Sequence, residues 1–410
     1  MQSEVWRRLR SLLANLLLLG GSLLCCAALT LAVLLNLPAP APADAGPQLP
    51  DYGELVAYDP ARPGGHLKPG LDLWVQGERA GQRVRWRTDR HGFRIDHDLV
   101  LPKPAGIERV ILLGDSYIDG MRTDQSQTIG ALLEAKWRAG GAAVEVLISG
   151  HNNPANAWYW LQEHSAAFQP DRVLLAITLG NDLMAQNLGA GLAVGADGRV
   201  QLVDPQLVDG KPDRWPSLLP PDAYTAPNAW LDAWNQREFA WRERLAARYG
   251  WFAHSVPSMT GPFPNAPRQV YDRDLYVSTG LYFVPANAFA EESFAASATT
   301  LKGIAGLLRE RGVAFEVMLL PIRIQVSKPD WRLFKRRYGL EGQRFDLRAP
   351  NRRLLAACAE AGIVCLDPTE AMAEAIAERG LQPFRPRGDM HYNEAGNAFI
   401  AEFWAGQHKP

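Results

Sequence analysis

The stretch Val110-Ile111-Leu112-Leu113-Gly114-Asp115-Ser116 decides the fold of this chain. Its four apolar residues form a run too short for a helix, and such a run is typical of a strand buried on both faces. Gly114 ends the run, and a helix-like pattern begins at about residue 128. We therefore predict that Ser116 lies just beyond the carboxyl end of a central strand, at the edge where open α/β sheets bind ligands. Taken alone, the Gly-Asp-Ser triplet favours a plainer interpretation, a turn in which serine caps the following helix.

Strands and helices alternate along most of the remaining chain. Apolar runs predict further strands at residues 144–148, 172–177, 314–320 and 363–366. Patterns of helical period predict helices at about residues 128–138, 156–168, 297–311, 349–361 and 368–379, and a last one ending near residue 404. This alternation predicts an α/β fold, a parallel sheet with helices on both faces.

The N-terminal segment predicts a membrane anchor. Residues 12–37 are almost wholly apolar and uncharged, which is long enough to span a bilayer. Arg7, Arg8 and Arg10 precede this span, so the positive-inside rule places residues 1–37 as a cytoplasmic N-terminus followed by a transmembrane helix. The rest of the chain is then expected on the periplasmic or extracytoplasmic side of the cytoplasmic membrane. A cleavable signal peptide, ending near Ala43-Asp44-Ala45, is the alternative.

Three further segments divide the chain after the span. Residues 38–50 form a stiff linker rich in Pro and Ala, and residues 51–107 a small β-rich lead-in with alternating strands near 71–75 and 84–88. In the lead-in we expect Phe93 to be a packing anchor and Arg94 a structural ion-pair partner. The main domain spans residues 108–410 and carries an insertion at about 184–291 that is rich in Pro and Trp. The insertion is a lid over the site, a partner surface, or a small core of its own.

Net charge and cysteine spacing bear on the partners and cofactors of the chain. The 410 residues carry a net charge of −1, which gives no indication of nucleic-acid binding. Cys358 and Cys365 lie on a predicted helix and the strand after it. They either pair as a disulfide in an oxidising compartment or are two small buried side chains, and they lack the spacing of a metal site. The sequence implies neither a metal nor an organic cofactor.

Chemically active residues follow three of the predicted strands. Ser116, Gly150 and Asn181 each come after a strand, and Asp389 and His391 lie near the C-terminus. Because parallel strands open their carboxyl ends on one edge of a sheet, these residues can converge. Together they supply a nucleophile, a backbone donor, a side-chain donor and an acid–base pair.

This set resembles the SGNH hydrolases, also called the GDSL esterase superfamily. The four motif blocks match, in order, Gly114-Asp115-Ser116, Ile148-Ser149-Gly150, Gly180-Asn181-Asp182 and Asp389-Met390-His391. The resemblance implies a flavodoxin-like, three-layer α/β/α sandwich with a parallel central sheet. One departure is Tyr117, which stands where the family often has leucine.

The resemblance also implies a division of roles. Ser116 would attack an ester carbonyl after losing its proton to His391, and Asp389 would hold the imidazole. The oxyanion would be bound by the N–H groups of Ser116 and Gly150 and by the side-chain amide of Asn181.

Two neighbouring carboxylates have a supporting role. We expect Asp115 and Asp182 to brace their turns through hydrogen bonds from the side chain to the backbone.

Three functions remain open at this point. The first is a membrane-anchored serine esterase that removes O-acyl or O-acetyl groups from a cell-envelope glycan or lipid. The second is a polysaccharide O-acetyltransferase that uses the same residues, with a sugar hydroxyl in place of water, as part of envelope polysaccharide machinery. The third is a non-catalytic envelope scaffold or glycan-binding protein, which would not need Ser116, Asp389 and His391 together.

Overall fold

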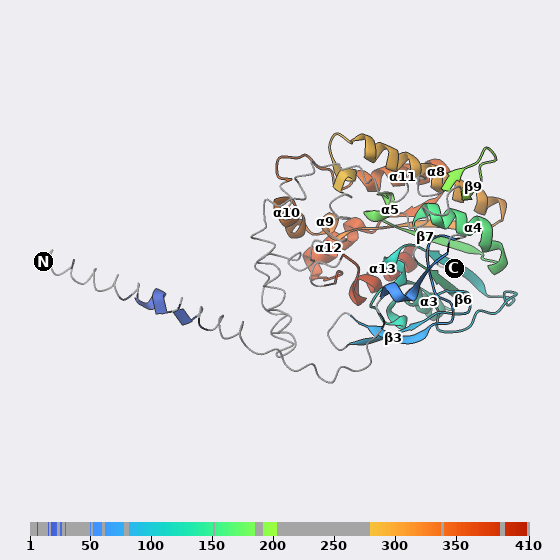
Figure 1. Ribbon diagram of the computed structural model, residues 1–410, viewed down its shortest axis with the longest axis horizontal. Coiled ribbons are helices and arrows are strands. Elements are labelled where there is room, and N and C mark those ends of the chain that lie inside the picture. Colours follow the sequence, from blue (N-terminus) through green and yellow to red (C-terminus); the bar gives the residue numbers. More distant parts are fainter. Residues whose placement is uncertain are drawn as a thin grey trace. The chain divides into compact units, whose positions relative to one another are not determined.

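A five-stranded parallel sheet forms the centre of the protein in the computed structural model (Figure 1). Its strands are β5 (Glu108–Leu113), β6 (Val144–Ser149), β7 (Arg172–Thr178), β10 (Ala314–Leu320) and β11 (Val364–Leu366). They lie side by side in the order β11-β10-β7-β5-β6. Numbered by appearance in this sheet, the order is 2-1-3-4-5 from the β6 edge, which is the flavodoxin-like order. The prediction of an α/β fold around a parallel sheet is confirmed.

The described residues do not cover the whole chain. They are residues 50, 52–59, 62–77, 82–150, 152–184, 192–202, 279–337, 340–385 and 390–407, with isolated helical positions between 6 and 29. All those from residue 50 onward belong to one compact unit.

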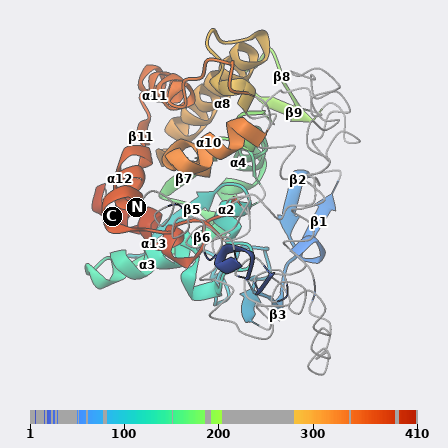
Figure 2. The ribbon, with the colours of Figure 1, turned by 90° about the vertical axis from the view of Figure 1, so that its left-hand side faces the viewer.

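Helices cover both faces of the sheet. One face carries α4 (Pro154–Phe168), α8 (Ala288–Glu310) and α11 (Ala349–Ala361), and the other carries α3 (Ile129–Ala139), α12 (Thr369–Arg379) and α13 (Glu394–Gln407). Two views at right angles agree on this separation, with α8 and α11 on one side of the sheet and α3 and α13 on the other (Figures 1 and 2). The fold is therefore a three-layer sandwich.

The alternation of side chains along each strand builds two cores. In β5, Ile111 and Leu113 point into the core shared with α4 and α8, whereas Val110 and Leu112 point into the core shared with α3 and α13. All four are fully buried. A strand whose two faces are both covered needs apolar residues at successive positions. The unbroken apolar run at residues 110–113 is therefore explained by the central place of β5 in the sheet.

The lead-in consists of two antiparallel hairpins. They are β1 (Val56–Asp59) with β2 (Arg62–Leu67), and β3 (Asp72–Gln76) with β4 (Arg83–Arg87). Leu55, Val56, Leu67, Val75, Val84 and Trp86 form a small core of their own. Phe93, predicted to be a packing anchor, is buried against the rings of Trp160 and Phe168.

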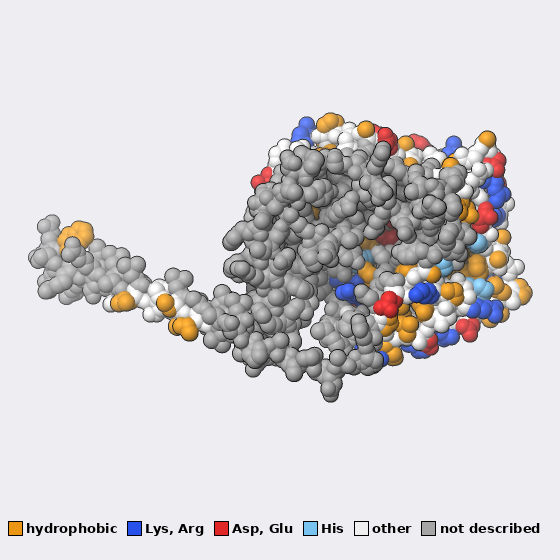
Figure 3. Space-filling model, viewed as in Figure 1, with side chains coloured by type: hydrophobic (Ala, Val, Ile, Leu, Met, Phe, Trp, Pro, Cys, Tyr) orange, Lys and Arg blue, Asp and Glu red, His pale blue; other side chains and the backbone are white. Residues whose placement is uncertain are grey.

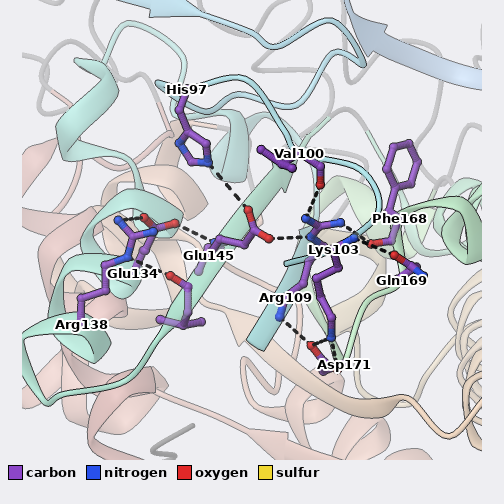
Figure 4. A network of polar contacts seen from close by, with 12 residues as sticks. His97, Val100, Lys103, Arg109, Glu134, Arg138, Glu145, Phe168, Gln169 and Asp171 are labelled. Carbon is purple, nitrogen blue, oxygen red and sulfur yellow. Dashed lines mark hydrogen bonds and ion pairs between the residues drawn. The ribbon is translucent and has the colours of Figure 1, made fainter. Parts of the chain in front are cut away.

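A buried polar network attaches the end of the lead-in to the amino ends of the strands (Figure 4). Arg109 of β5 is fully buried and pairs with Glu145 of β6 at 2.7 Å. Its guanidinium also donates to the carbonyl oxygens of Val100 and Phe168. His97 lies 3.8 Å from the same glutamate. This network therefore fixes the lead-in at the sheet edge opposite to Ser116.

The structure corrects the start of one predicted helix and contains another helix that was not predicted. The helix predicted to begin near residue 297 begins at Ala288, where the Asn287 side chain caps the amide of Ala290. A helix that the sequence did not predict, α10 (Lys328–Arg337), follows the short α9 (Arg323–Val326). The predicted start was wrong because residues 288–296 are rich in alanine and show a weak apolar stripe.

Much of the predicted insertion and most of the predicted span lie outside the described residues. Within the insertion, β8 (Leu192–Val194) and β9 (Val200–Leu202) form an antiparallel hairpin. No helix made of described residues is long and apolar enough to cross a membrane. The described part of the face in Figure 3 intermingles basic, acidic and apolar side chains. Cys358 and Cys365 are both free thiols.

Candidate active site

The turn after β5 presents Ser116 at the carboxyl edge of the sheet. The chain turns at Gly114, where a Cβ atom would overlap the Ile118 side chain. Asp115 then caps the short helix α2 (Ser116–Asp119), because its carboxylate accepts a hydrogen bond from the Tyr117 amide at 2.9 Å. Ser116 is the first residue of this helix and is partly exposed. It follows β5, whose neighbours are β6 and β7, so it lies where the strand order reverses and ligands bind in such sheets.

His391 lies beside Ser116. The serine Oγ and the histidine Nε2 are 2.7 Å apart, although 275 residues separate them in the sequence. The imidazole is only 5% exposed. A serine hydroxyl hydrogen-bonded to a buried imidazole can pass its proton to that ring, which is the arrangement that activates a nucleophilic serine.

The histidine is held by its neighbours in the chain. The backbone N–H of Arg385 donates to the His391 carbonyl at 3.0 Å. Tyr392, which follows, donates its hydroxyl to the carbonyl of Pro321, just after β10, at 2.7 Å. These two bonds fix the backbone at His391 and at the residue that follows it. Asp389, predicted to orient this ring, lies outside the described residues.

The loop after β6 is attached to the nucleophile turn. The Asn152 amide donates to the Gly114 carbonyl, and its side chain donates to the Gly150 carbonyl, both at 2.8 Å. The α-carbon of Gly150 lies against the fully buried Asp119 carboxyl, so that a Cβ at residue 150 would overlap it. The structure therefore brings Gly150 next to the turn that carries Ser116. His151 lies outside the described residues.

The turn after β7 contributes Asn181 and Asp182. Asn181 opens helix α5 (Asn181–Met184), and its side chain is outside the described part of the structure. The Asp182 carboxylate accepts a hydrogen bond from the Thr178 amide at 2.8 Å and so ties the end of β7 to α5. Burial raises the pKa of Asp182 well above its ordinary value, and the neighbouring Asp115 carboxylate raises it further. This interaction places the β7 turn close to the β5 turn.

Arg94 supports the nucleophile turn from behind. It is fully buried, and its guanidinium donates to the carbonyl oxygens of Asp119, Gly120 and Thr123. It also stacks on the Trp86 ring at 3.6 Å from the ring centroid. The predicted role was an ion-pair partner. Its guanidinium bonds to backbone carbonyls of the turn that follows Ser116 and to the Gln125 side chain, and a charge in the sequence does not reveal these partners.

Sequence reasoning gave no role to two residues that shape this site, Tyr117 and Asn152. Asn152 offered a signal, because it follows a strand end as Asn181 does. Tyr117 offered another as the one departure beside the nucleophile. Among the described residues, no group of three or more His, Cys, Asp or Glu side chains is arranged to hold a metal ion.

Comparison with known proteins gives structural matches only. No protein-family model matches this sequence, and no curated protein matches it. Over 73% of its length, the chain is similar to a solved acetyl xylan esterase, AlAXEase, with 10% identity, a TM-score of 0.36 and 98% of that chain covered.

Two other solved structures give similar values. TesA matches over 74% of this chain and 99% of its own, with 12% identity and a TM-score of 0.35. A catalytic mutant of Axe2, an acetylxylan esterase from Geobacillus stearothermophilus, matches over 73% and 93%, with 14% identity and a TM-score of 0.34.

Proposed function

We propose that this chain is a serine ester hydrolase of the SGNH type, with Ser116 as nucleophile and His391 as general base. The observation that carries the proposal is the 2.7 Å contact between the serine Oγ and the histidine Nε2. The place of the serine supports it, because Ser116 is partly exposed at the carboxyl end of the central strand β5.

The reaction follows from these positions. His391 takes the hydroxyl proton while Ser116 Oγ bonds to the carbonyl carbon, and the carbonyl oxygen becomes an oxyanion. The imidazolium then gives its proton to the departing alcohol, which leaves an acyl-enzyme. Water, deprotonated by His391, attacks the acyl group and releases the acid and the free serine. Asp389 is proposed to hold the imidazole in the tautomer that accepts the serine proton.

Three donors are proposed for the oxyanion: the N–H groups of Ser116 and Gly150 and the side-chain amide of Asn181. The amide of Ser116 opens a helix, so it has no carbonyl within that helix to bond. The attachment of the Gly150 loop to the nucleophile turn supports the second donor. Each such donor contributes about 2.7–4 kcal/mol of transition-state stabilisation in well-studied enzymes.

The proposed substrate is an O-acetyl or other O-acyl ester on a glycan of the cell envelope. Support comes from the apolar span at residues 12–37 with Arg7, Arg8 and Arg10 before it, which would place the catalytic domain outside the cytoplasmic membrane. The tryptophans of the insertion supply side chains of the kind that stack on sugar rings. We propose the envelope as the location on these grounds.

The test is the fate of the acyl group. The full chain, purified in detergent, is incubated with p-nitrophenyl acetate and with an acetylated oligosaccharide, beside Ser116→Ala as the inactive control. The proposal expects free acetate from the wild type and none above background from the variant. Acetate that appears on added sugar hydroxyls instead of in solution would identify a transferase. A folded wild type that neither hydrolyses nor transfers would overturn the catalytic assignment.

A further inference from the structure

Tyr117 joins the nucleophile turn directly to the segment that carries the histidine. It follows Ser116 in the chain and is only 3% exposed. Its hydroxyl donates to the carbonyl oxygen of Met390 at 2.6 Å. Its ring lies over the imidazole of His391, with the ring centroids 4.9 Å apart and the planes 36° from parallel. One side chain therefore touches both the histidine and the residue before it.

The same tyrosine is itself held firmly. Its amide donates to the Asp115 carboxylate at 2.9 Å, within the cap of α2. The edge of its ring meets Tyr392 at a centroid distance of 4.9 Å and an angle of 85°, a favourable aromatic geometry. Because its backbone, its ring and its hydroxyl are all fixed, this side chain can hold the nucleophile turn and the histidine segment at a constant separation.

We propose that Tyr117 is a positioning residue, which holds the His391 imidazole at hydrogen-bond distance from Ser116. The inference rests on the proposed function, because it assumes that His391 accepts the serine proton. The hydroxyl fixes the backbone at Met390, and the ring limits the rotation of the imidazole. A leucine side chain is smaller and provides neither the hydrogen bond nor the flat face.

The two contacts can be separated by substitution. Tyr117→Phe keeps the ring and removes the bond to the Met390 carbonyl. Tyr117→Leu removes both. Since a buried hydrogen bond lost in this way changes an equilibrium by about fivefold, we expect kcat to fall about 3- to 10-fold in the phenylalanine variant. For the leucine variant we expect about 100-fold, the effect of displacing a reacting group by roughly 1 Å.

The experiment measures kcat and KM for p-nitrophenyl acetate with the full chain in detergent, together with the rate at which a fluorophosphonate probe labels the protein. The matched control is Ser297→Ala, which removes a buried hydroxyl-to-carbonyl bond on α8, 2.7 Å from Ser297 Oγ to the Ser293 carbonyl. The positioning role predicts lower kcat and slower labelling in both Tyr117 variants, KM within about twofold, and partial recovery with phenylalanine relative to leucine. Ser297→Ala should keep the wild-type kcat.

Each of the remaining outcomes would overturn the positioning role, the proposed function, or both. Wild-type kcat and labelling rates in Tyr117→Phe and in folded Tyr117→Leu would overturn the positioning role and leave the proposed function standing. If Tyr117→Leu does not fold, an unchanged Tyr117→Phe overturns the role of the hydroxyl bond by itself. An equal loss in Ser297→Ala would show a general effect of stability and overturn the inference. A folded wild type that is neither labelled nor active would refute the proposed function, and this inference with it.

Discussion

Replacing Gly150 with alanine tests the packing beneath the proposed oxyanion site. A Cβ at residue 150 would overlap the Asp119 carboxyl, which is fully buried. Either Asp119 or the Gly150 loop must shift. Overpacking of this kind costs about 1–3 kcal/mol of stability. If the Gly150 amide leaves its place, one oxyanion donor is lost, and we expect kcat to fall about 100- to 1,000-fold.

The assay combines urea denaturation with the hydrolysis of p-nitrophenyl acetate. Gly306→Ala is the matched control, because nothing lies within 4 Å of a Cβ at that position of α8. Alanine there should stabilise the helix by about 0.5–1 kcal/mol and leave kcat unchanged.

A double variant shows whether Asp119 causes the effect. Asp119→Ala removes the three atoms that lie nearest to the new Cβ, so Gly150→Ala should cost less stability in that background. We expect a coupling energy of about 0.5–3 kcal/mol, the range for residues in contact. Stability losses that simply add would refute the close packing of Asp119 on Gly150. Wild-type kcat in a folded Gly150→Ala would refute the donor role of this loop.

Three further substitutions test buried and charged contacts, two beside the site and one at the opposite edge of the sheet. Arg94→Lys should lower the free energy of unfolding by about 2–4 kcal/mol in urea denaturation, because lysine cannot reach all the carbonyls that the guanidinium caps; a loss below about 1 kcal/mol would contradict its bracing role. Burial and the Asp115 carboxylate raise the pKa of Asp182. In the folded state Asp182 therefore keeps a proton that it loses in the unfolded state above about pH 4. The free energy of unfolding should fall as the pH rises from there. Asp182→Asn should flatten that slope, which denaturation at pH 4 and pH 7 would measure. Pairing with Glu145 raises the pKa of His97 to about 9. The contribution of His97 to the free energy of unfolding is therefore fully present below about pH 6.5 and is lost as the pH rises through 9. Because His97 is 39% exposed, the loss should be about 1 kcal/mol or less, and His97→Gln should abolish it.

The sheet was largely predictable because its strands are buried on both faces. The runs at β5, β6, β7 and β10 contain almost no polar residue in their central positions. Short apolar runs of this kind are typical of strands that are buried on both faces of a sheet. Helix α8 was predicted with the wrong start, since its first nine residues are mostly small and carry little periodic signal. Helix α10 was missed because charged residues outnumber apolar ones in Lys328–Arg337.

The site was predictable in part, and for a different reason. Ser116 and His391 are 275 residues apart, and no local pattern relates them. Their pairing was expected because parallel strands share one functional edge and because the motif order resembles a known superfamily. Supporting contacts are harder to foresee, since they depend on geometry that composition does not encode. Arg94 illustrates this, because the sequence shows its charge but not the carbonyl oxygens that it caps.

The position of a covalent adduct tests the central claim most directly. The full chain is treated with a fluorophosphonate probe, digested, and mapped by mass spectrometry, beside Ser116→Ala and His391→Ala. We predict one adduct per chain on Ser116, none in Ser116→Ala, and labelling at least 100-fold slower in His391→Ala, as expected when a general base is removed. An adduct on another residue, or labelling at the wild-type rate without His391, would contradict the assignment of this pair as nucleophile and base.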